Sequence, residues 1–259
     1  MIPNLFTFHG SDHKVGTTML SLSIASAISR YHQNLKILQI SMNGRESTEY
    51  IREAPVTVDT LKIQIENRML HEQDFLKICK HNANLYVMAG PSNELEERFY
   101  CPEGAAYLLE EISPYFDIVI ADSGNEIDNG LAIGALQCSR DIFYIVTQQE
   151  TSLSRYEKRK DIYDNVGVVF SDLILNKYVE HDFYDAAYVA DRMQSEAQNV
   201  WKVSASDYAK QAEMEHMTLI DYKNDKFIQD IVELSNCILS KSGLPEIKKQ
   251  RKNIWRSFI

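Results

Sequence analysis

The chain has 259 residues, of which 44% are hydrophobic and 25% are charged, a balance typical of a folded globular protein. Its 27 basic and 37 acidic residues give a formal net charge of −10, and so acidic a surface generally repels nucleic acid. No apolar run approaches the roughly 18 to 20 residues that cross a bilayer. Residues 1–4 also lack the basic start of a secretory signal. We therefore expect a soluble, cytoplasmic protein without a nucleic-acid partner.

The four cysteines lie far apart in the chain and form no CxxC pair: Cys79, Cys101, Cys138 and Cys237. A cytosolic protein keeps its thiols reduced, and isolated cysteines there are most often buried. We expect four buried, reduced thiols and no disulfide framework.

Short apolar segments alternate with longer segments of helical period. The predicted strands are Leu5–Phe8, Lys36–Ile40, Leu85–Ala89, Ile118–Ala121, Ile142–Val146, Leu173–Asn176 and Val200–Val203. Because these strands are short and almost continuously apolar, we expect both of their faces to be buried in a parallel sheet. The predicted helices between and after them are Thr18–Arg30, Gly104–Pro114 and Lys226–Leu239, the last with Asp225 as its N-cap.

This alternation predicts an α/β fold with a doubly wound, mainly parallel sheet of about seven strands and helices on both faces. We assign residues 1–242 to this domain and residues 243–259 to a separate C-terminal tail. Ligands of such folds bind beyond the carboxyl ends of the strands. The residues that directly follow strands are therefore the candidates for function.

The segment after the first predicted strand has the context of a phosphate-binding loop. In such a loop, backbone N–H groups and a helix N-terminus hold an anionic phosphate. Against the pattern GxxxxGK[ST], Ser replaces the first glycine and Thr replaces the lysine, whereas the later glycine and the hydroxyl residue match. The candidate loop is Ser11, Asp12, His13, Lys14, Val15, Gly16, Thr17 and Thr18. The alternative is an ordinary turn in which Thr17 or Thr18 caps the helix. We interpret His9 and His13 as polar loop residues.

Two later strands also end in polar residues. Asp122 follows the apolar run 118–121, as in a Walker B segment, where an acid and a loop hydroxyl such as that of Thr18 hold Mg²⁺. Asn176 ends the run 173–175, and its amide offers the paired donor and acceptor that can read an adenine edge.

The order and spacing of these segments, from about Asn4 to Leu239, resemble the ParA/MinD branch of P-loop NTPases, and most of all its CpaE/TadZ pilus-assembly localisation group. The deviant Walker A pattern of that family, KGGxGK[ST], falls on residues 12–18. The resemblance implies ATP and Mg²⁺ as ligands. Gly16 and Thr18 would contact phosphate and metal, Asp122 would be the Walker B acid, and Asn176 would read the base.

The chain departs from the family at its charged positions. Both family lysines are replaced, by Asp12 and by Thr17, and the second predicted strand runs into Ser41-Met42-Asn43, where active members carry acids. Phosphoryl transfer depends on positioning and charge neutralisation, so these losses predict weak or absent hydrolysis. Asp122 is the candidate catalytic residue, and we interpret Lys14 as a solvated loop lysine.

The resemblance implies a positioning or scaffold factor of the cell-pole, pilus, secretion or division-site type. Such a factor acts as a homodimer with a protein partner. The alternative is an active, slow ATPase switch that cycles between an ATP-bound dimer and a monomer, with Lys14 in compensation. An iron-protein relative bridged by Cys101 and Cys138 is disfavoured because their neighbours are not glycine-rich. The 14 tyrosines are scattered, unlike those of capsular tyrosine kinases.

The C-terminal tail reverses the charge of the body. Gly243-Leu244-Pro245 predicts the end of a helix, and residues 248–259 then carry five basic residues and no acid. From Glu246 on, one helical face gathers apolar side chains: Ile247, Ile254, Trp255, Phe258 and Ile259. A basic amphipathic helix of this kind binds anionic lipid. We therefore predict peripheral attachment to the inner face of the membrane through residues 246–259, with docking on the body or on a protein partner as the alternatives.

Overall fold

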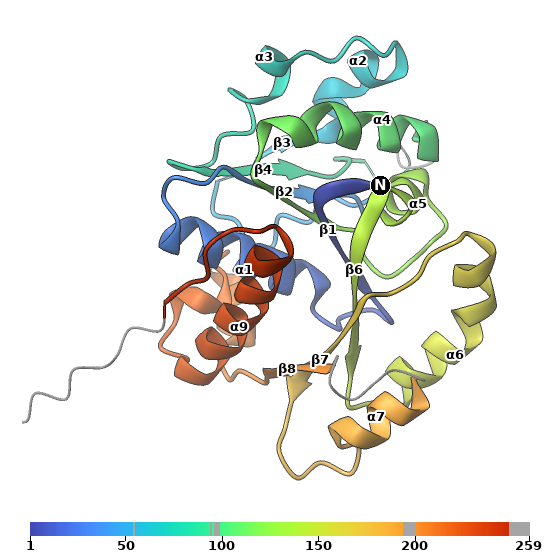
Figure 1. Cartoon of the computed structure of the whole chain (residues 1–259), viewed down its shortest axis with the longest axis vertical. Helices are drawn as coiled ribbons and strands as arrows, with labels where there is room; N and C mark the ends of the chain where they lie inside the picture. The colour runs from blue at the N-terminus through green and yellow to red at the C-terminus, as the bar shows by residue number, and fades with distance from the viewer. Residues whose placement is uncertain (54, 94, 96–98, 194–199, 249–259) are drawn as a thin grey trace, which may run out of the picture.

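The computed structural model describes residues 1–53, 55–93, 95, 99–193 and 200–248. In this part of the chain an eight-stranded sheet has the order β3-β4-β2-β5-β1-β6-β7-β8, and all pairings between these strands are parallel (Figure 1). The strands are β1 (Ile2–Gly10), β2 (Ile37–Ser41), β3 (Val56–Thr57), β4 (Leu85–Ala89), β5 (Ile118–Asp122), β6 (Ser139–Thr147), β7 (Asp172–Tyr178) and β8 (Val200–Ser204).

The predicted doubly wound α/β fold is confirmed. All seven predicted strands are present, and the additional strand is β3 at one edge of the sheet. With only two residues, β3 is too short to leave a periodic pattern in the sequence.

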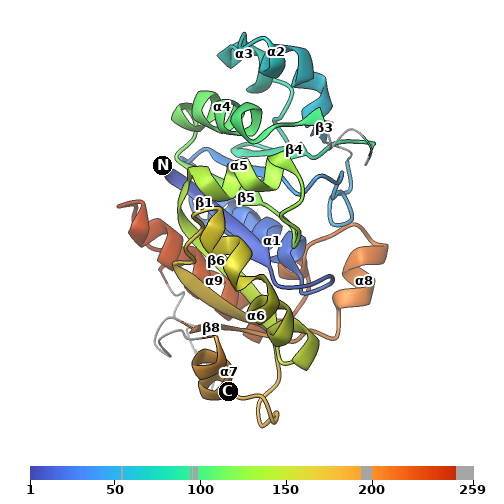
Figure 2. The ribbon, with the colours of Figure 1, turned by 90° about the vertical axis from the view of Figure 1, so that its right-hand side faces the viewer.

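The helices cover both faces of the sheet. They are α1 (Thr17–Tyr31), α2 (Lys62–Glu66), α3 (Glu72–Phe75), α4 (Pro102–Ile112), α5 (Gly130–Cys138), α6 (Glu150–Asn165), α7 (Ala186–Arg192), α8 (Ala209–Met214) and α9 (Asp225–Lys241). Short 3-10 turns occupy Val58–Leu61, Ser113–Tyr115 and Leu219–Asp221. Figure 2 shows α1 and α9 on one side of the central strands and α4 and α5 on the other.

Successive side chains of the central strands enter different hydrophobic clusters. Ile120 of β5 belongs to the cluster of Ile24 from α1 and Ile231 from α9, whereas its neighbour Val119 belongs to that of Leu108 from α4. A third cluster joins β6 and β7 to α6 and α7. Because both faces of the central strands are covered, these strands are largely apolar, which made them visible in the sequence.

The start of α9 differs from the prediction by one residue. Asn224 is the N-cap, and its side-chain oxygen accepts a hydrogen bond from the Phe227 N–H at 3.4 Å. The prediction of Asp225 as the cap is wrong. Both residue types can cap a helix, and Asp225 instead places its charge in the first turn, near the positive end of the helix dipole.

The cysteines are free thiols, as predicted, but they are not all buried. Cys79 is buried, and burial raises the pKa of its thiol to about 12. Cys138 and Cys237 are partly buried, and Cys101 is exposed. The prediction is therefore wrong for Cys101, which occupies the N-cap position of α4 and so lies at a helix end on the surface.

The described part of the predicted tail packs on the body. Residues 244–248 are not helical, and Ile247 is only 5% exposed, in the cluster of α1 and α9. The Ile247 N–H donates to Asn236 Oδ1 of α9 at 2.7 Å. The predicted helix therefore does not begin at Glu246, because Ile247 packs against α9 in a non-helical segment. Residues 249–259, which carry the rest of that prediction, lie outside the described residues.

Across the described residues, none of the helices combines the length and the apolar character needed to cross a membrane.

Candidate functional site

The predicted phosphate-binding loop lies at the carboxyl edge of the sheet, between β1 and α1. The Gly10 N–H donates to the Gly124 carbonyl at 2.6 Å, and the Ser11 N–H donates to the Ile145 carbonyl at 2.8 Å. These bonds attach the start of the loop to the segment after β5 on one side and to β6 on the other. The loop is thus held where ligands of open parallel sheets bind.

The backbone conformation and the surroundings of position 16 favour glycine. Gly16 has φ +98°, and a Cβ at this position would lie 2.5 Å from the Asn176 Nδ2. Gly16 is also the N-cap of α1, and no side chain caps the helix there. The alternative of a threonine cap is therefore wrong, and the first amides of α1 remain available to an anion.

Thr18 and Asp122 meet as the metal-site prediction requires. Thr18 Oγ1 donates to Asp122 Oδ2 at 2.6 Å, and the Gly124 N–H donates to Asp122 Oδ1 at 2.9 Å. Asp122 is fully buried, and burial raises its pKa to about 6, although these hydrogen bonds act in the opposite direction. A hydroxyl beside a carboxylate is an oxygen donor set that Mg²⁺ accepts, so this pair fits the implied metal.

The end of β2 reaches the same carboxylate with neutral groups. Ser41 is in register with Asp122, and Asn43 Nδ2 donates to Asp122 Oδ2 at 3.2 Å and to Ser47 Oγ at 2.7 Å. An amide therefore lies where the family pattern implies an acid. The acid of this segment that acts on Asp122 is Glu49, whose charge helps to raise the pKa of Asp122. The sequence reasoning assigned no role to Glu49.

Thr17 takes the place of the motif lysine, but its side chain is directed under the loop. It is only 7% exposed, and its Oγ1 lies 2.5 Å from the position that a Cβ on Gly10 would occupy. The hydroxyl packs against the end of β1 and brings no charge to the phosphate position.

Asn176 holds the loop from β7. Its Nδ2 donates to the Val15 carbonyl at 2.7 Å, and the residue is buried. The amide nitrogen is thus committed to the loop backbone in this structure, and the base-reading role of Asn176 stays a prediction. The next residue, Lys177, donates from Nζ to the carbonyl of Lys14, which is exposed on the loop.

The helix α6 contacts the loop through polar side chains. Ser11 Oγ and Ser152 Oγ, both buried, are 2.6 Å apart, and Asp12 Oδ1 lies 2.9 Å from a guanidinium nitrogen of Arg155. Arg155 also contacts Glu126 at 2.9 Å, and Arg159 pairs with the same carboxylate. Sequence reasoning missed these residues. Ser152, Arg155 and Arg159 are three and four positions apart, which places them on one face of the helix. This spacing is the sequence feature that could have indicated them.

His9 is not the loop residue that we predicted. It lies within β1 and is fully buried, with Nδ1 2.9 Å from Ser123 Oγ and Nε2 3.1 Å from the Tyr163 hydroxyl. Burial, together with the charge of Arg159, lowers the pKa of His9 to about 3, so the imidazole is neutral. The prediction is wrong because β1 extends beyond Phe8 to Gly10 and turns His9 toward aromatic rings of α6 and β6.

His13 lies in the loop, as predicted; it is exposed, and its Nε2 lies 3.6 Å from Glu126 Oε1.

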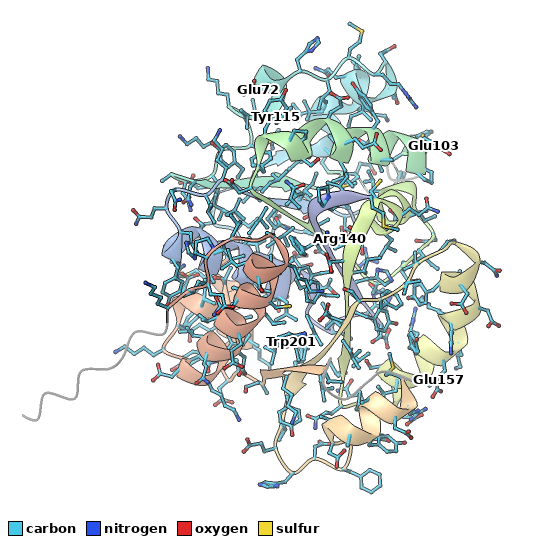
Figure 3. The ribbon with its side chains drawn as sticks, in the orientation of Figure 1. Glu72, Glu103, Tyr115, Arg140, Glu157 and Trp201 are labelled. Carbon is cyan, nitrogen blue, oxygen red and sulfur yellow. The ribbon has the colours of Figure 1, made fainter. Side chains whose placement is uncertain are left out.

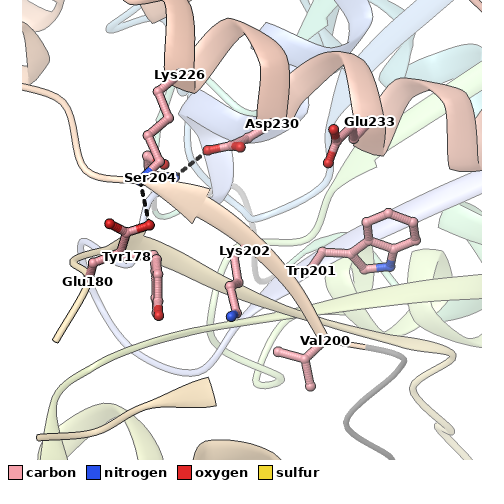
Figure 4. Close-up of a pocket in the computed structure, with 9 residues that line it drawn as sticks. All are labelled: Tyr178, Glu180, Val200, Trp201, Lys202, Ser204, Lys226, Asp230 and Glu233. Atoms are coloured by element: carbon pink, nitrogen blue, oxygen red, sulfur yellow. Dashed lines mark hydrogen bonds and ion pairs between the residues drawn. The ribbon is translucent and has the colours of Figure 1, made fainter. Parts of the chain in front are cut away.

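A second concave surface lies between β8 and the first half of α9, and its lining includes Tyr178 (Figure 4). Its volume is about 340 Å³. Lys226 and Glu180 form an ion pair at 3.3 Å across its rim, and the Ser204 N–H donates to Asp230 at 2.8 Å. None of the predicted site residues lines it.

Comparison with protein-family models gives no match, and a search of curated proteins finds no relative. Solved structures do match. A ParA family ATPase from Chlorobium tepidum TLS has a TM-score of 0.77 at 15% identity, with 90% of this chain and 98% of that chain covered. The septum site-determining protein MinD with Mg-ADP from Pyrococcus horikoshii OT3 has a TM-score of 0.70 at 13% identity, with 92% and 98% covered. The MinC:MinD cell division protein complex of Aquifex aeolicus gives 0.70 at 15% identity, with 96% and 98% covered.

These similarities show the fold. The chain has the α/β architecture of ParA- and MinD-type ATPases, with a loop, a threonine and a buried aspartate at the edge where that class of fold binds its ligands.

Proposed function

We propose that this chain is a positioning or scaffold protein of the ParA/MinD type, related to the CpaE/TadZ group, with weak or absent ATP hydrolysis. The contact between Thr18 Oγ1 and Asp122 Oδ2, 2.6 Å long at the uncapped start of α1, carries the proposal. It supplies a metal-binding pair beside an anion-binding helix terminus. The similarity to MinD with Mg-ADP supports ATP and Mg²⁺ as the ligands.

Hydrolysis should be weak because the cationic and acidic groups that support it are replaced. Thr17 packs under the loop, Asp12 reverses the charge of the family lysine, and Asn43 stands where an acid would act. A single positive charge at a phosphoryl centre is worth on the order of 10³-fold in rate. We therefore place the function in binding and dimerisation rather than in turnover.

The partners we propose are a second copy of the chain and a protein of a localisation, secretion or pilus system. The similarity to MinD in its complex with MinC supports a protein partner. We also propose peripheral attachment to an anionic membrane through the basic tail. Because Ile247 packs on α9, the attaching segment begins after residue 248.

An active ATP-driven switch is the second candidate. It is favoured by Lys14, which is exposed on the loop itself and has the length to approach a bound phosphate. In that case Lys14 would supply the charge that Thr17 lacks.

Thermal unfolding with and without ATP and Mg²⁺ tests nucleotide binding. A ligand at 100 times its Kd stabilises a protein by about 2.7 kcal/mol, so we expect a clear rise in Tm. Asp122→Asn and Thr18→Ala should lose the Mg²⁺-dependent part of that rise, whereas Lys226→Met, which removes a lysine paired with Glu180, should retain it. An unchanged Tm of the unsubstituted protein would contradict nucleotide binding.

A phosphate-release assay then separates the two candidates. We expect release close to the background without protein. Robust turnover that is abolished in Lys14→Ala would refute the scaffold proposal and establish the active switch.

A further inference from the structure

Lys177 reaches the phosphate-binding loop from a different part of the chain. Its Nζ donates to the carbonyl of Lys14, and its Cε lies 4.0 Å from the position that a Cβ on Gly16 would occupy. The ammonium group therefore lies on the loop, near the glycine that is the N-cap of α1.

The backbone directs Lys177 into this position. Lys177 has φ +55°, a left-handed conformation that costs a non-glycine residue free energy, and Lys14 opposite it has φ +59°. The register between β7 and β8 also shifts between Leu175 and Tyr178. Such irregularities re-aim side chains and are common beside functional sites. The adjacent Asn176, bonded to Val15, fixes β7 against the loop at the same point.

The electrostatic surroundings of Lys177 differ from those of the other cations near the loop. Arg155 is paired with Asp12 and Glu126, each at 2.9 Å, and Arg159 is paired with Glu126. Among the described residues, no carboxylate forms an ion pair with Lys177. Partial burial lowers the pKa of Lys177, and the positive charge of Lys14 lowers it further. Two like charges beside one loop, without an acid between them, form a site that an anion would stabilise.

We propose that Lys177 supplies from β7 the positive charge that Thr17 does not supply from the loop, so that its ammonium group binds the phosphates of a bound nucleotide. An ammonium group has three donors, and the Lys14 carbonyl uses one of them. The remaining donors are available to a ligand, on a side chain whose Cε lies 4.0 Å from the position that a Cβ on Gly16 would occupy. This inference rests on the proposed function, because it takes the loop to be a nucleotide site.

Isothermal titration of the full-length protein with ATP and Mg²⁺ tests the inference. Lys177→Met should weaken binding by about 10- to 100-fold, which corresponds to one charge-assisted hydrogen bond, and Lys177→Arg should restore most of the loss. Lys226→Met, which removes a lysine that pairs with Glu180 and not with the loop, should bind like the unsubstituted protein. Equal affinity of Lys177→Met and the unsubstituted protein would overturn the inference, and a loss confined to Lys14→Met would assign the charge to Lys14.

Amine-reactive labelling followed by mass spectrometry tests the same contact without a substitution. ATP with Mg²⁺ should protect Lys177 from the reagent and leave Lys226 equally labelled. Bound ATP that leaves the labelling of Lys177 unchanged would overturn the inference while nucleotide binding stands. Failure of the unsubstituted protein to bind ATP would instead refute the proposed nucleotide site, and the inference with it.

Discussion

Gly16 shows how one residue constrains the loop. Its left-handed backbone is costly for any other residue, and the Asn176 amide leaves no room for a Cβ. Gly243, after α9, also has a positive φ, +69°, but no atom lies within 4 Å of its Cβ position. Alanine substitutions at the two glycines therefore separate the free-energy cost of a left-handed backbone from the steric cost of the added Cβ.

We expect Gly243→Ala to lower the free energy of unfolding by about 1 kcal/mol, the cost of a left-handed alanine. Gly16→Ala should lower it by roughly 2 to 4 kcal/mol, because Asn176 must also move and its bond to Val15 is lost. Urea denaturation measures both values. Equal losses would show that Asn176 does not crowd Gly16.

His9 is a second residue whose burial predicts a pH dependence of the free energy of unfolding. It is neutral when folded because its pKa is lowered to about 3, whereas in the unfolded chain it titrates near 6.5. Below pH 6.5 the unfolded state therefore binds a proton that the folded state does not. The stabilisation is complete above that pH and is lost as the pH falls toward 3.

Between pH 7.5 and pH 5 this linkage should remove about 2 kcal/mol of unfolding free energy. His9→Gln keeps a polar group beside Ser123 and Tyr163 but does not titrate. We expect its stability to fall by about 2 kcal/mol less over the same range, as measured by urea denaturation at each pH. Parallel curves for the two proteins would contradict a neutral, buried His9.

At the scale of elements, α6 is joined to the loop by polar contacts rather than by a broad apolar face. The buried pair Ser11–Ser152 and the ion pairs of Arg155 and Arg159 lie on its inner side. On its outer side Arg192 of α7 bridges Glu150 and the exposed Glu157, which Figure 3 labels. Arg159 of α6 and Arg192 of α7 thus provide an inner and an outer contact of α6 for comparison.

Arg159→Met should lower the unfolding free energy by about 2 kcal/mol, because Arg159 is only 14% exposed and also donates to the Asn125 carbonyl. Arg192→Met should cost less than about 1 kcal/mol, since its carboxylate partners are exposed. Chemical denaturation of both variants checks the order of the two values. A larger loss in Arg192→Met would show that the inner contacts do not hold α6.

At the scale of the whole molecule, charge is unevenly distributed. The chain carries a net charge of −10 although residues 248–259 contain five basic residues and no acid. Each lysine or arginine near an anionic bilayer contributes about 1 kcal/mol of binding free energy. A truncated chain that ends at residue 248 retains Ile247 and its bonds to Asn236, so the truncation removes four of the five basic residues without disturbing α9.

We expect the full-length protein to sediment with phosphatidylglycerol vesicles at low salt and to be released at high salt. The chain ending at residue 248 should remain in solution, and neutral phosphatidylcholine vesicles should bind neither protein. Equal sedimentation of both proteins, together with a lower Tm for the shorter one, would mean that the tail docks on the body instead.

The sequence by itself determined the fold class, seven of the eight strands and the meeting of Thr18 with Asp122. Periodicity and strand-end residues are local signals, and a parallel sheet brings strand ends to one edge whatever the details. Only the tertiary structure decided that His9 is buried, that Ile247 packs on α9, that α6 clamps the loop and that Lys177 lies on it. These contacts join residues that are 11 to more than 160 positions apart, as between Asn236 and Ile247 or between Lys14 and Lys177. No periodic pattern encodes such a contact, because it depends on how the packed elements direct each side chain.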